Sequence, residues 1–486
     1  MASFSTEFDP TLEGSLPPDF HWGFATAAAQ IEGAWNRDGR GPSIWDTFCH
    51  SGGNIKDNTT VDDACMSYDL IEEDVARMKS YGINAYRFSL SWSRIIPLGG
   101  KDDPVNEAGI AYYSKLVDRL LENGITPFLT LYHWDLPESL YRRYGGMLNK
   151  ARYTLDFMRY ARVCFESFGD RVKYWITYNE PVLSARAGYA EGRHAPGHTS
   201  ATEVWIVGHT EIVSHARVCA MYKQEFQPTQ KGHIMITLSG DWCEPWDQDD
   251  PLDLEATKRA MDFDIGWFAD PLYGKGECDY PASMRAQLGD RLPCFTAEEQ
   301  RLIRGSSEFY GMNSYTSHFI KHRDGPPEEN DAKGNIVRMD TNKDGKERGT
   351  ESDTPWLRTA PWGWAKLLRW IWDRYQLPIY ITENGTTAKG ELGWRPNSND
   401  DILEDPHRID YYKSYVAEVA KASQEGIVIK SYLAWSLLDN FEWALGYTAR
   451  FGVTWVDFED PKRTRYTKRS ALFLGEIFRH LIAQKR

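Results

Sequence analysis

Two glutamates of the 486-residue sequence stand where a pair of carboxylates could act on one bond. Glu180 lies in ITYNEP and Glu383 lies in ITENG, and each closes a strongly apolar segment. Two carboxylates that flank a glycosidic bond are the minimum apparatus for sugar transfer, because one can attack the anomeric carbon while the other donates a proton. An arbitrary pair of this kind is more often held in structural ion pairs, so the surrounding motifs must decide.

The segments that would position these glutamates are short, apolar and β-rich, and they alternate with helical stretches. Helical segments such as 68–82, 111–124 and 364–376 end near Gly or Pro, where helices stop. Continuous apolar runs are typical of parallel strands that are covered on both faces. We therefore expect an α/β fold, one (β/α)8 TIM barrel, with strands at 20–28, 84–90, 126–133, 173–180, 232–240, 308–316, 378–385 and 431–439.

Polar and ionisable residues gather at the C-terminal ends of these segments. A barrel brings those ends to one mouth, so residues that are far apart in the sequence would share a pocket. Two polar stretches, about 321–361 and 386–408, follow strand ends and predict extended βα loops on the same face. No segment resembles an interdomain linker, so residues 1–486 are expected to form a single catalytic domain.

The composition and charge of the chain disfavour several classes of function. Lys+Arg 56 minus Asp+Glu 70 gives a net charge of −14, which argues against binding to nucleic acid or to an anionic membrane. No uncharged apolar run approaches the roughly 18 residues that span a bilayer. The N-terminal segment shows no signal-peptide pattern, and the seven cysteines include no CxxC pair. A cytoplasmic protein with reduced thiols is therefore expected, and its oligomeric state is left open.

A series of motifs runs in order along nearly the whole chain. They are FHWGFATAAAQIEGAW, RFSLSWSRIIP, LYHWDLP, TYNEP, GMNSYT, ITENG and SLLDNFEW. Together they resemble glycoside hydrolase family 1, the β-glucosidase family, and the nearest likeness is to its intracellular fungal members. The two glutamates stand in two of these motifs, so the resemblance favours a catalytic interpretation of the pair.

The resemblance implies a retaining double displacement with Glu383 as the nucleophile and Glu180 as the general acid/base. Glu383 must be ionised, and Arg87 in RFS matches the family arginine that lies beside the nucleophile. Glu180 must begin protonated, and burial together with the charge of Glu383 would raise its pKa. Once Glu383 is glycosylated, the pKa of Glu180 should fall, so that it can act as a base on water. Retention also requires the two carboxyl groups to lie about 5–5.5 Å apart.

The resemblance also implies a site for the glycone. Asn179 would bind the sugar 2-hydroxyl, Tyr315 would hydrogen-bond the nucleophile, and Asn313 would line the same wall. Trp435 would form the platform under the ring, because an aromatic face packs on the C–H face of a hexose. The residues that match the family's contacts to the 3-, 4- and 6-hydroxyls are Gln30, His133, Trp134, Glu442 and Trp443.

Two of these residues narrow the class of substrate. A carboxylate at Glu442 would repel a 6-phosphate, and FEWALGY does not contain the set of Ser, Lys and Tyr that the phospho-sugar members of the family carry in this region. Glu180 stands where myrosinase-like thioglucosidases have Gln, so O-glycosides are the expected substrates. The aglycone side is less distinct, and its candidates are Trp356 as a platform for a second sugar, with Val182, Leu183 and Phe451 at the entrance.

The predicted function is hydrolysis of terminal non-reducing β-D-glucosyl residues, with some transglycosylation. Cellobiose, cello-oligosaccharides and aryl β-glucosides are the expected substrates, and small carbohydrates are the only expected partners. One alternative is a preference for β-galactosides or β-fucosides, because Glu442 can accept hydrogen bonds from either C4 epimer. The other is a non-catalytic sugar-binding barrel, which the presence of both glutamates disfavours.

No metal or organic cofactor is expected, because the two carboxylates supply both the proton and the nucleophile. Residues 340–351 fit the spacing of an EF-hand calcium loop. However, position eight is Glu347 instead of a hydrophobic residue, and neither flank resembles a helix. A solvated polar loop is the preferred interpretation.

Overall fold

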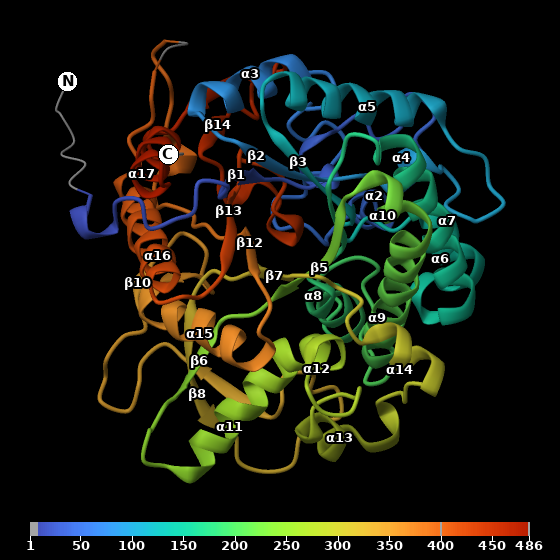
Figure 1. The fold of residues 1–486 in the computed structure, drawn as a ribbon, viewed down its shortest axis with the longest axis vertical. Coiled ribbons are helices and arrows are strands. Elements are labelled where there is room, and N and C mark those ends of the chain that lie inside the picture. Colours follow the sequence, from blue (N-terminus) through green and yellow to red (C-terminus); the bar gives the residue numbers. More distant parts are fainter. Residues whose placement is uncertain (1–7, 399–400, 485–486) are drawn as a thin grey trace.

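The computed structural model describes residues 8–398 and 401–484, and its centre is a closed barrel of parallel strands (Figure 1). The strands form a ring in the order β1-β13-β12-β7-β5-β4-β3-β2. Each predicted strand corresponds to one member of this ring, so the TIM barrel is confirmed. In the described residues the members are β1 (His21–Ala25), β2 (Ala85–Ser89), β3 (Thr126–Tyr132), β4 (Tyr174–Asn179), β5 (His233–Ser239), β7 (Tyr310–Asn313), β12 (Ile379–Glu383) and β13 (Ile429–Trp435).

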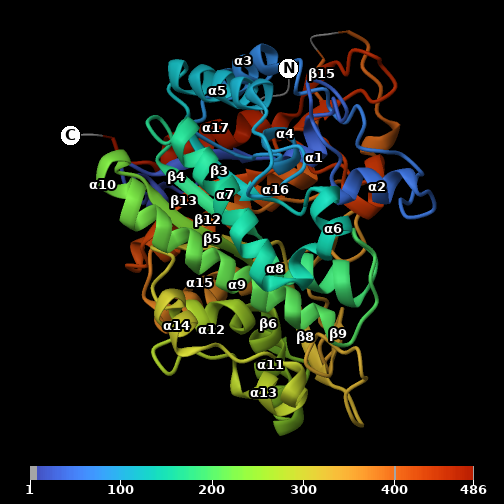
Figure 2. The same ribbon diagram turned by 90° about the vertical axis from the view of Figure 1, so that its right-hand side faces the viewer.

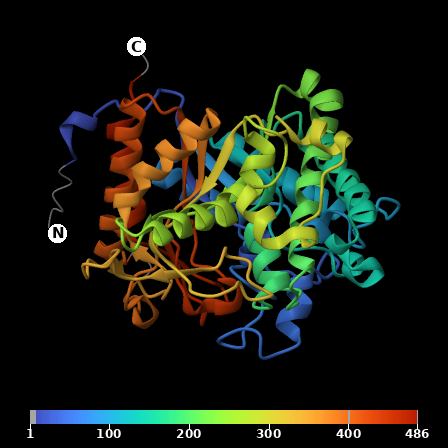
Figure 3. The same ribbon diagram turned by 90° about the horizontal axis from the view of Figure 1, so that it is seen from below.

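Helices cover the outside of the barrel. Figures 2 and 3 show the teal and green helices on one side of the molecule and the orange and red helices on the other. They include α3 (Ile71–Tyr81), α5 (Glu107–Glu122), α7 (Lys150–Phe168), α9 (Glu203–Met221), α14 (Ala297–Ile303), α15 (Trp364–Tyr375), α16 (Pro406–Gln424) and α17 (Arg469–Leu481). The remaining α-helices of the described residues are α1 (Ala28–Ile31), α2 (Ile44–His50), α4 (Trp92–Ile95), α6 (Glu138–Tyr144), α8 (Pro181–Ala185), α10 (Gln227–Gln230), α11 (Pro251–Met261), α12 (Trp267–Tyr273) and α13 (Ala282–Leu288).

The α3 helix illustrates how local sequence sets the bounds of these elements. Its first turn carries three acidic residues, which interact favourably with the positive end of the helix dipole. It stops at Gly82, whose φ of 77° is the left-handed conformation that commonly closes a helix. The predicted helices at 68–82, 111–124 and 364–376 correspond to α3, α5 and α15.

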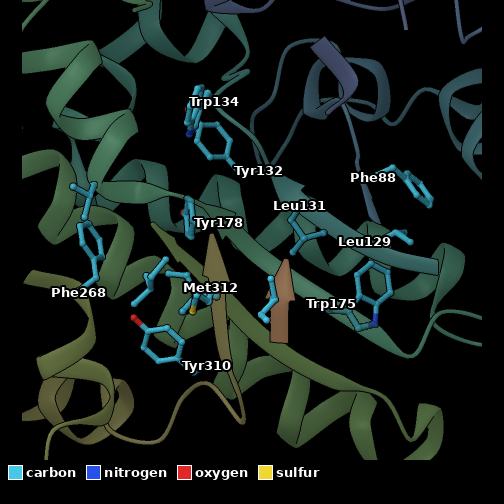
Figure 4. Close-up of a cluster of buried hydrophobic side chains, with 14 of the residues drawn as sticks. Phe88, Leu129, Leu131, Tyr132, Trp134, Trp175, Tyr178, Phe268, Tyr310 and Met312 are labelled. Carbon is cyan, nitrogen blue, oxygen red and sulfur yellow. The ribbon is translucent and has the colours of Figure 1, made fainter. Parts of the chain in front are cut away.

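Apolar side chains fill two regions, because successive residues of a strand point to opposite faces. Phe128 belongs to the cluster inside the barrel, together with Ile176 and Met235. Its neighbour Leu129 belongs to the larger cluster outside. Figure 4 shows part of this outer cluster, which includes Phe88, Leu129, Leu131, Trp175, Tyr178, Tyr310 and Met312.

The inside of the barrel changes from apolar to polar toward the C-terminal ends of its strands. Two residues beyond Phe128 in β3 is Thr130, and two residues beyond Met235 in β5 is Thr237. Arg87 of β2 donates from Nε to Oγ1 of Thr130 over 3.1 Å. This polar layer forms the floor of the mouth that the sequence predicts to be the site.

The segment after β7 contains more structure than the predicted loop at 321–361. It includes the end of β8 (Ser317–His322) and β9 (Ile336–Met339), which with β6 (Trp242–Pro245) form a separate sheet. It also includes the short pair β10 (Thr350–Glu351) and β11 (Arg358–Thr359). The predicted extended loop is therefore present, and short antiparallel pairings within it satisfy part of its backbone. A further pair, β14 (Thr454–Val456) and β15 (Arg465–Thr467), follows the last barrel strand.

The stretch with calcium-loop spacing lies inside this segment. Its first residue, Asp340, accepts a hydrogen bond from Nε of Arg348 over 2.8 Å and also pairs with Arg358. The backbone N–H of Asn342 donates to the carbonyl of Lys346, which makes the stretch a tight hairpin turn. The carboxylate that would begin a calcium loop is thus occupied by arginines.

A buried ion network ties the segment after β12 to the segment after β13. Arg408 donates to Glu391, and Nζ of Lys468 bridges Glu391 at 2.7 Å and Asp439 at 2.8 Å. All four side chains are buried. Because Asp439 belongs to the segment that also carries Glu442, the network fixes one wall of the barrel mouth.

Two further predictions concern the cysteines and the membrane. All seven cysteines are free, and only Cys294 is exposed, which agrees with the expected reduced thiols. In residues 8–398 and 401–484, no helix combines the length and the apolar character needed to cross a membrane.

Candidate active site

Glu180 and Glu383 leave the barrel at the C-terminal ends of β4 and β12. Glu383 is the last residue of β12, and Glu180 directly follows β4. Glu180 has a left-handed backbone with φ 48°, and its N–H donates to the carbonyl of Thr237 over 2.9 Å. Pro181 then begins α8, a position that suits its fixed φ. The TYNEP motif therefore turns the chain off the strand and points the carboxyl group into the mouth. Both glutamates are buried.

The ITENG motif is explained by contacts immediately after Glu383. Asn384 donates from Nδ2 to the carbonyl of Ser314 over 2.8 Å, and its own carbonyl accepts from the N–H of Trp435 over 2.8 Å. A Cβ on Gly385 would lie 1.8 Å from the carbonyl oxygen of Trp435. Glycine is required at this point because the backbone of β13 passes so close.

The carboxylate of Glu383 is held at both oxygens. Arg87 donates from Nη1 to Oε1 over 2.5 Å, and the hydroxyl of Tyr315 donates to Oε2 over 2.7 Å. Arg87 is fully buried, so its charge is little screened by solvent. The arginine and the tyrosine that the resemblance assigned to Glu383 both contact it in the structure.

Asn313 joins the two carboxyl groups into one site. Its Nδ2 donates to Oε1 of Glu180 over 2.7 Å, and its Oδ1 accepts from the hydroxyl of Thr382 over 2.7 Å. Thr382 directly precedes Glu383, so this amide lies between the ends of β4 and β12. The predicted carboxyl separation of about 5–5.5 Å stays a prediction.

The surroundings of the two carboxyl groups favour different protonation states. Burial and the charge of Glu383 raise the pKa of Glu180 well above its usual value, against weaker effects of Asn313 and Arg87. Burial also raises the pKa of Glu383, but Arg87 and the Tyr315 hydroxyl oppose the rise. A single proton shared by the site therefore resides on Glu180, because Glu383 has the guanidinium beside it.

Asn179 and His133 are oriented by a chain of hydrogen bonds. Oδ1 of Asn179 accepts from Nη2 of Arg87 over 2.6 Å, so its Nδ2 must be the group that faces Nε2 of His133 at 3.0 Å. Burial and the charge of Arg87 lower the pKa of His133 well below its usual value, so the ring is neutral. Nε2 then accepts, and the proton of His133 resides on Nδ1.

Gln30 is oriented in the same way from the opposite wall. Its Nε2 donates to Oδ1 of Asn440 over 3.0 Å and to the carbonyl of Phe441 over 2.8 Å. Its Oε1 therefore remains as an acceptor.

Three of the predicted glycone residues carry a buried polar atom without a partner among the described residues. These atoms are Oε1 of Gln30, Nδ1 of His133 and Oε2 of Glu442. Buried polar atoms are normally hydrogen-bonded, so an unpaired one needs an explanation, and the hydroxyl groups of a ligand would supply the missing partners here. Nδ1 of His133 is a donor and Oε1 of Gln30 is an acceptor. This combination suits sugar hydroxyl groups, because a hydroxyl can donate one hydrogen bond and accept another.

The protonation of Glu442 modifies one sequence-based argument. Burial and the charge of Glu383 raise the pKa of Glu442 to about 8. At neutral pH the group is then largely protonated, so it can donate to a sugar hydroxyl as well as accept from it. Its repulsion of a 6-phosphate is consequently weaker than the sequence suggests.

Aromatic rings form a continuous wall beside these polar atoms. The ring of His133 stacks with Trp435 at 5.9 Å and with Trp443 at 5.9 Å, and Trp134 lies 4.6 Å from Trp443 between ring centroids. Nε1 of Trp134 donates to the carbonyl of Asn179 over 2.9 Å. Trp134 therefore offers its ring, and not its N–H, to a ligand.

The aglycone candidates occupy two different environments. Trp356 is 45 % exposed and packs edge-on against Tyr315, and Phe451 packs edge-on against another part of the same ring. Leu183 is half-buried, whereas Val182 is buried in the outer core. Phe451 is as buried as Val182, since each is only 2 % exposed. Trp356 and Leu183 thus have the better access to a second sugar, and the roles of all four residues stay predictions.

Sequence reasoning missed three residues that hold this site together. Asn440 orients Gln30, Asn384 holds Ser314, and Asp241 accepts the backbone N–H groups of Tyr315 and Thr316. Asn384 lies in ITENG and Asn440 lies in SLLDNFEW, so the motifs could have identified both asparagines. Asp241 follows β5 outside these motifs, and nothing in its local sequence indicates a contact with Tyr315. Within the described residues, no three His, Cys, Asp or Glu side chains are grouped to hold a metal ion.

Comparison with known proteins agrees with this arrangement. The sequence model for glycosyl hydrolase family 1 matches residues 12–481. This chain belongs to glycosyl hydrolase family 1. Among curated relatives, β-glucosidase 1B of Phanerodontia chrysosporium is 48% identical, with 96% of this chain and 86% of that protein covered.

Solved structures of fungal family 1 enzymes are also similar to this glycosyl hydrolase. The β-glucosidase of Trichoderma harzianum superposes with a TM-score of 0.93 at 53% identity, over 96% of this chain and 98% of that one. The β-glucosidase of Humicola insolens, solved in complex with glucose, gives a TM-score of 0.92 at 52% identity over 96% and 98% of the two chains. The predicted family, its fungal likeness and the glycosidase class of activity are therefore confirmed.

Proposed function

We propose that this family 1 enzyme hydrolyses terminal β-D-glucosides with retention, using Glu383 as the nucleophile and Glu180 as the acid/base. One observation carries the proposal. Two buried carboxyl groups flank Asn313, and only Glu383 is paired with a guanidinium. This asymmetry supplies an anion and a proton donor at the same cavity, which is what a double displacement requires.

The reaction then proceeds in two steps. Glu383 attacks the anomeric carbon, while Glu180 protonates the departing glycosidic oxygen and the C–O bond breaks. The resulting ester removes the charge of Glu383, so the pKa of Glu180 falls. Glu180 next accepts a proton from water as the water attacks, and Glu383 leaves as a carboxylate. A sugar hydroxyl in place of water would give transglycosylation.

The glucoside preference rests on the relatives and on the glycone contacts. The similar fungal enzymes are β-glucosidases, and one was solved with glucose. The unpaired atoms of Gln30, His133 and Glu442 suit a hexose whose hydroxyls lie in fixed positions. Cellobiose and short cello-oligosaccharides are the proposed natural substrates, which would place the enzyme late in cellulose degradation.

Relative kcat/KM on nitrophenyl β-glucoside, β-galactoside and β-fucoside tests this preference. We expect the glucoside to exceed the galactoside by about tenfold or more. An axial 4-hydroxyl could still reach Glu442, but it would pair poorly with the fixed Oε1 of Gln30, and a buried acceptor left unpaired costs roughly 1–3 kcal/mol. A higher kcat/KM on the galactoside or fucoside would contradict the proposed specificity without affecting the glycosidase assignment.

The pH dependence of kcat/KM tests the assignment of the two carboxyl groups. Glu383 must be ionised, so activity should fall as the pH drops through its pKa. Glu180 must be protonated, so activity should fall as the pH rises through its pKa, which burial and Glu383 place well above the usual value. With nitrophenyl β-glucoside, whose poorer leaving group is still assisted by protonation, the residual activity of the Glu180→Gln variant should lose the alkaline limb and keep the acid limb. An unchanged alkaline limb in this variant would show that another group carries the proton.

Several further predictions from the sequence remain proposals. Small carbohydrates are the proposed partners, without nucleic acid, metal or organic cofactor. The organisation of residues 1–486 as one domain and the cytoplasmic location also stay predictions.

A further inference from the structure

Asp241 lies outside the predicted site, yet its carboxylate gathers an unusual number of donors. Oδ1 accepts from the hydroxyl of Ser314 over 2.9 Å, from the N–H of Tyr315 over 2.8 Å and from the N–H of Thr316 over 3.1 Å. Oδ2 faces Nε2 of His318 at 3.3 Å. The side chain is only 20% exposed, so these contacts are poorly replaced by solvent.

The three donors to Oδ1 belong to one turn, residues 314–316, which joins β7 to β8. Its carbonyl groups are held from the opposite side. Asn384 donates to the carbonyl of Ser314 over 2.8 Å, and the hydroxyls of Tyr411 and Tyr415 donate to the carbonyl of Tyr315 over 2.7 and 3.1 Å. The backbone of Tyr315 is thus held by the Asp241 carboxylate at its N–H and by two tyrosine hydroxyls at its carbonyl, while Asn384 holds the preceding carbonyl of Ser314.

The clamped residue makes a direct contact with Glu383. The hydroxyl of Tyr315 donates to Oε2 of Glu383 over 2.7 Å, while Arg87 occupies Oε1. Because both oxygens are hydrogen-bonded, the carboxylate of Glu383 is held in a single orientation. Because small displacements of a reacting group reduce rates strongly, the backbone position of Tyr315 matters to the chemistry.

We propose that Asp241 is a positioning residue for the nucleophile, which holds the 314–316 turn so that the Tyr315 hydroxyl stays on Glu383. The inference rests on the proposed role of Glu383. Asp241 touches neither the nucleophile nor the acid/base through a hydrogen bond of its own, so it acts through Tyr315 and through its charge.

The charge of Asp241 adds a second effect that a purely structural residue would lack. The charged groups that face Glu180 are Glu383 and Asp241, which raise its pKa, and Arg87, which lowers it. Asp241 itself is faced by His318 and Arg338. Burial would raise the pKa of the Asp241 carboxyl, but its contact with His318 and the backbone N–H groups of Tyr315 and Thr316 hold that pKa below its usual value, so the group is ionised at neutral pH. Removing this charge should lower the pKa of Glu180 and move the alkaline limb to lower pH.

The Asp241→Asn variant tests the proposal, with Asp253→Asn as the matched control. Asp253 is also buried and accepts two backbone N–H groups, from His322 over 2.7 Å and from Asp247 over 3.0 Å, but it holds a segment with no contact to Glu383. We expect kcat of Asp241→Asn to fall by about 10–100-fold with KM little changed. Its alkaline limb should shift to lower pH, whereas Asp253→Asn should alter neither.

A double-mutant cycle with Tyr315→Phe separates positioning from general damage. If Asp241 acts through the tyrosine hydroxyl, Asp241→Asn should lower kcat by less than about threefold in the Tyr315→Phe background. Multiplicative losses would overturn the proposal. So would a kcat of Asp241→Asn equal to that of Asp253→Asn.

A second variant keeps the test decisive if Asp241→Asn folds poorly. Asp241→Glu retains the charge but shifts the carboxylate by one methylene, so it should lose kcat and keep the wild-type alkaline limb. Wild-type kcat in this variant would overturn the proposal. Failure of the proposed function looks different, because Glu383→Gln would then remain active whatever the Asp241 variants do.

Discussion

The Glu383→Gln variant should lose at least about 10⁴-fold in kcat/KM on nitrophenyl β-glucoside, or roughly 5.5 kcal/mol of transition-state stabilisation. Glutamine has nearly the same shape, but it carries no charge to attack or stabilise the anomeric carbon. It also cannot form the ester through which the double displacement passes. Initial rates at saturating and at limiting substrate concentrations give kcat and kcat/KM. A circular dichroism spectrum and a melting temperature equal to those of the wild type establish that the variant folds.

Glu404→Gln is the matched control for this variant. Glu404 lies in the segment that follows β12, but it is exposed and pairs with Arg469 at the surface. It should retain wild-type kcat/KM, since its carboxylate does not face the mouth of the barrel. Activity in folded Glu383→Gln equal to that of the control would remove Glu383 from the mechanism.

The Glu180→Ala variant should show a loss that depends on the leaving group. With cellobiose, whose leaving group needs a proton, kcat/KM should fall by about 10²–10⁴-fold, the usual contribution of general acid catalysis. With dinitrophenyl glucoside the first step should be nearly unaffected, because that phenolate leaves without protonation. Hydrolysis of the glycosyl-enzyme then becomes slow, since no base activates the water.

Azide should raise the turnover of Glu180→Ala on the activated substrate and yield β-glucosyl azide. Azide is small enough to fit the space left by the missing Glu180 side chain. As an anion it can attack the glycosyl-enzyme without a base to remove a proton. Glu180→Gln fills that space and should respond much less, which makes it the control. Equal losses on both substrates, or no response to azide in Glu180→Ala, would contradict the assignment of Glu180.

Local sequence patterns predicted the parts of the fold that depend on a few adjacent residues. The runs NAYRFSL and PIYITENG became β2 and β12, because β-branched and aromatic residues suit strands packed on both faces. Glu180 and Glu383 were found because each follows such a run. Their neighbours Arg87, Asn179 and Tyr315 came from the family resemblance, since their contacts cross the barrel and leave no local pattern.

The remaining features depend on long-range contacts that no local pattern specifies. Asp241 was missed because its partner Tyr315 lies 74 positions later in the chain. Asn440 holds Gln30 across 410 positions. The stretch at 321–361 was expected to be a loop because it is polar, yet β9 pairs there with β8 through backbone groups that composition does not report.

The anomer first released from a β-glucoside is the most direct measurement of the central claim, that two facing carboxyl groups act in turn on one anomeric carbon. Proton NMR at high enzyme concentration follows the product before mutarotation. Double displacement through Glu383 predicts β-glucose first, with α-glucose appearing only at the rate of mutarotation. Initial release of α-glucose would contradict the account, because a single inversion needs no nucleophilic carboxylate.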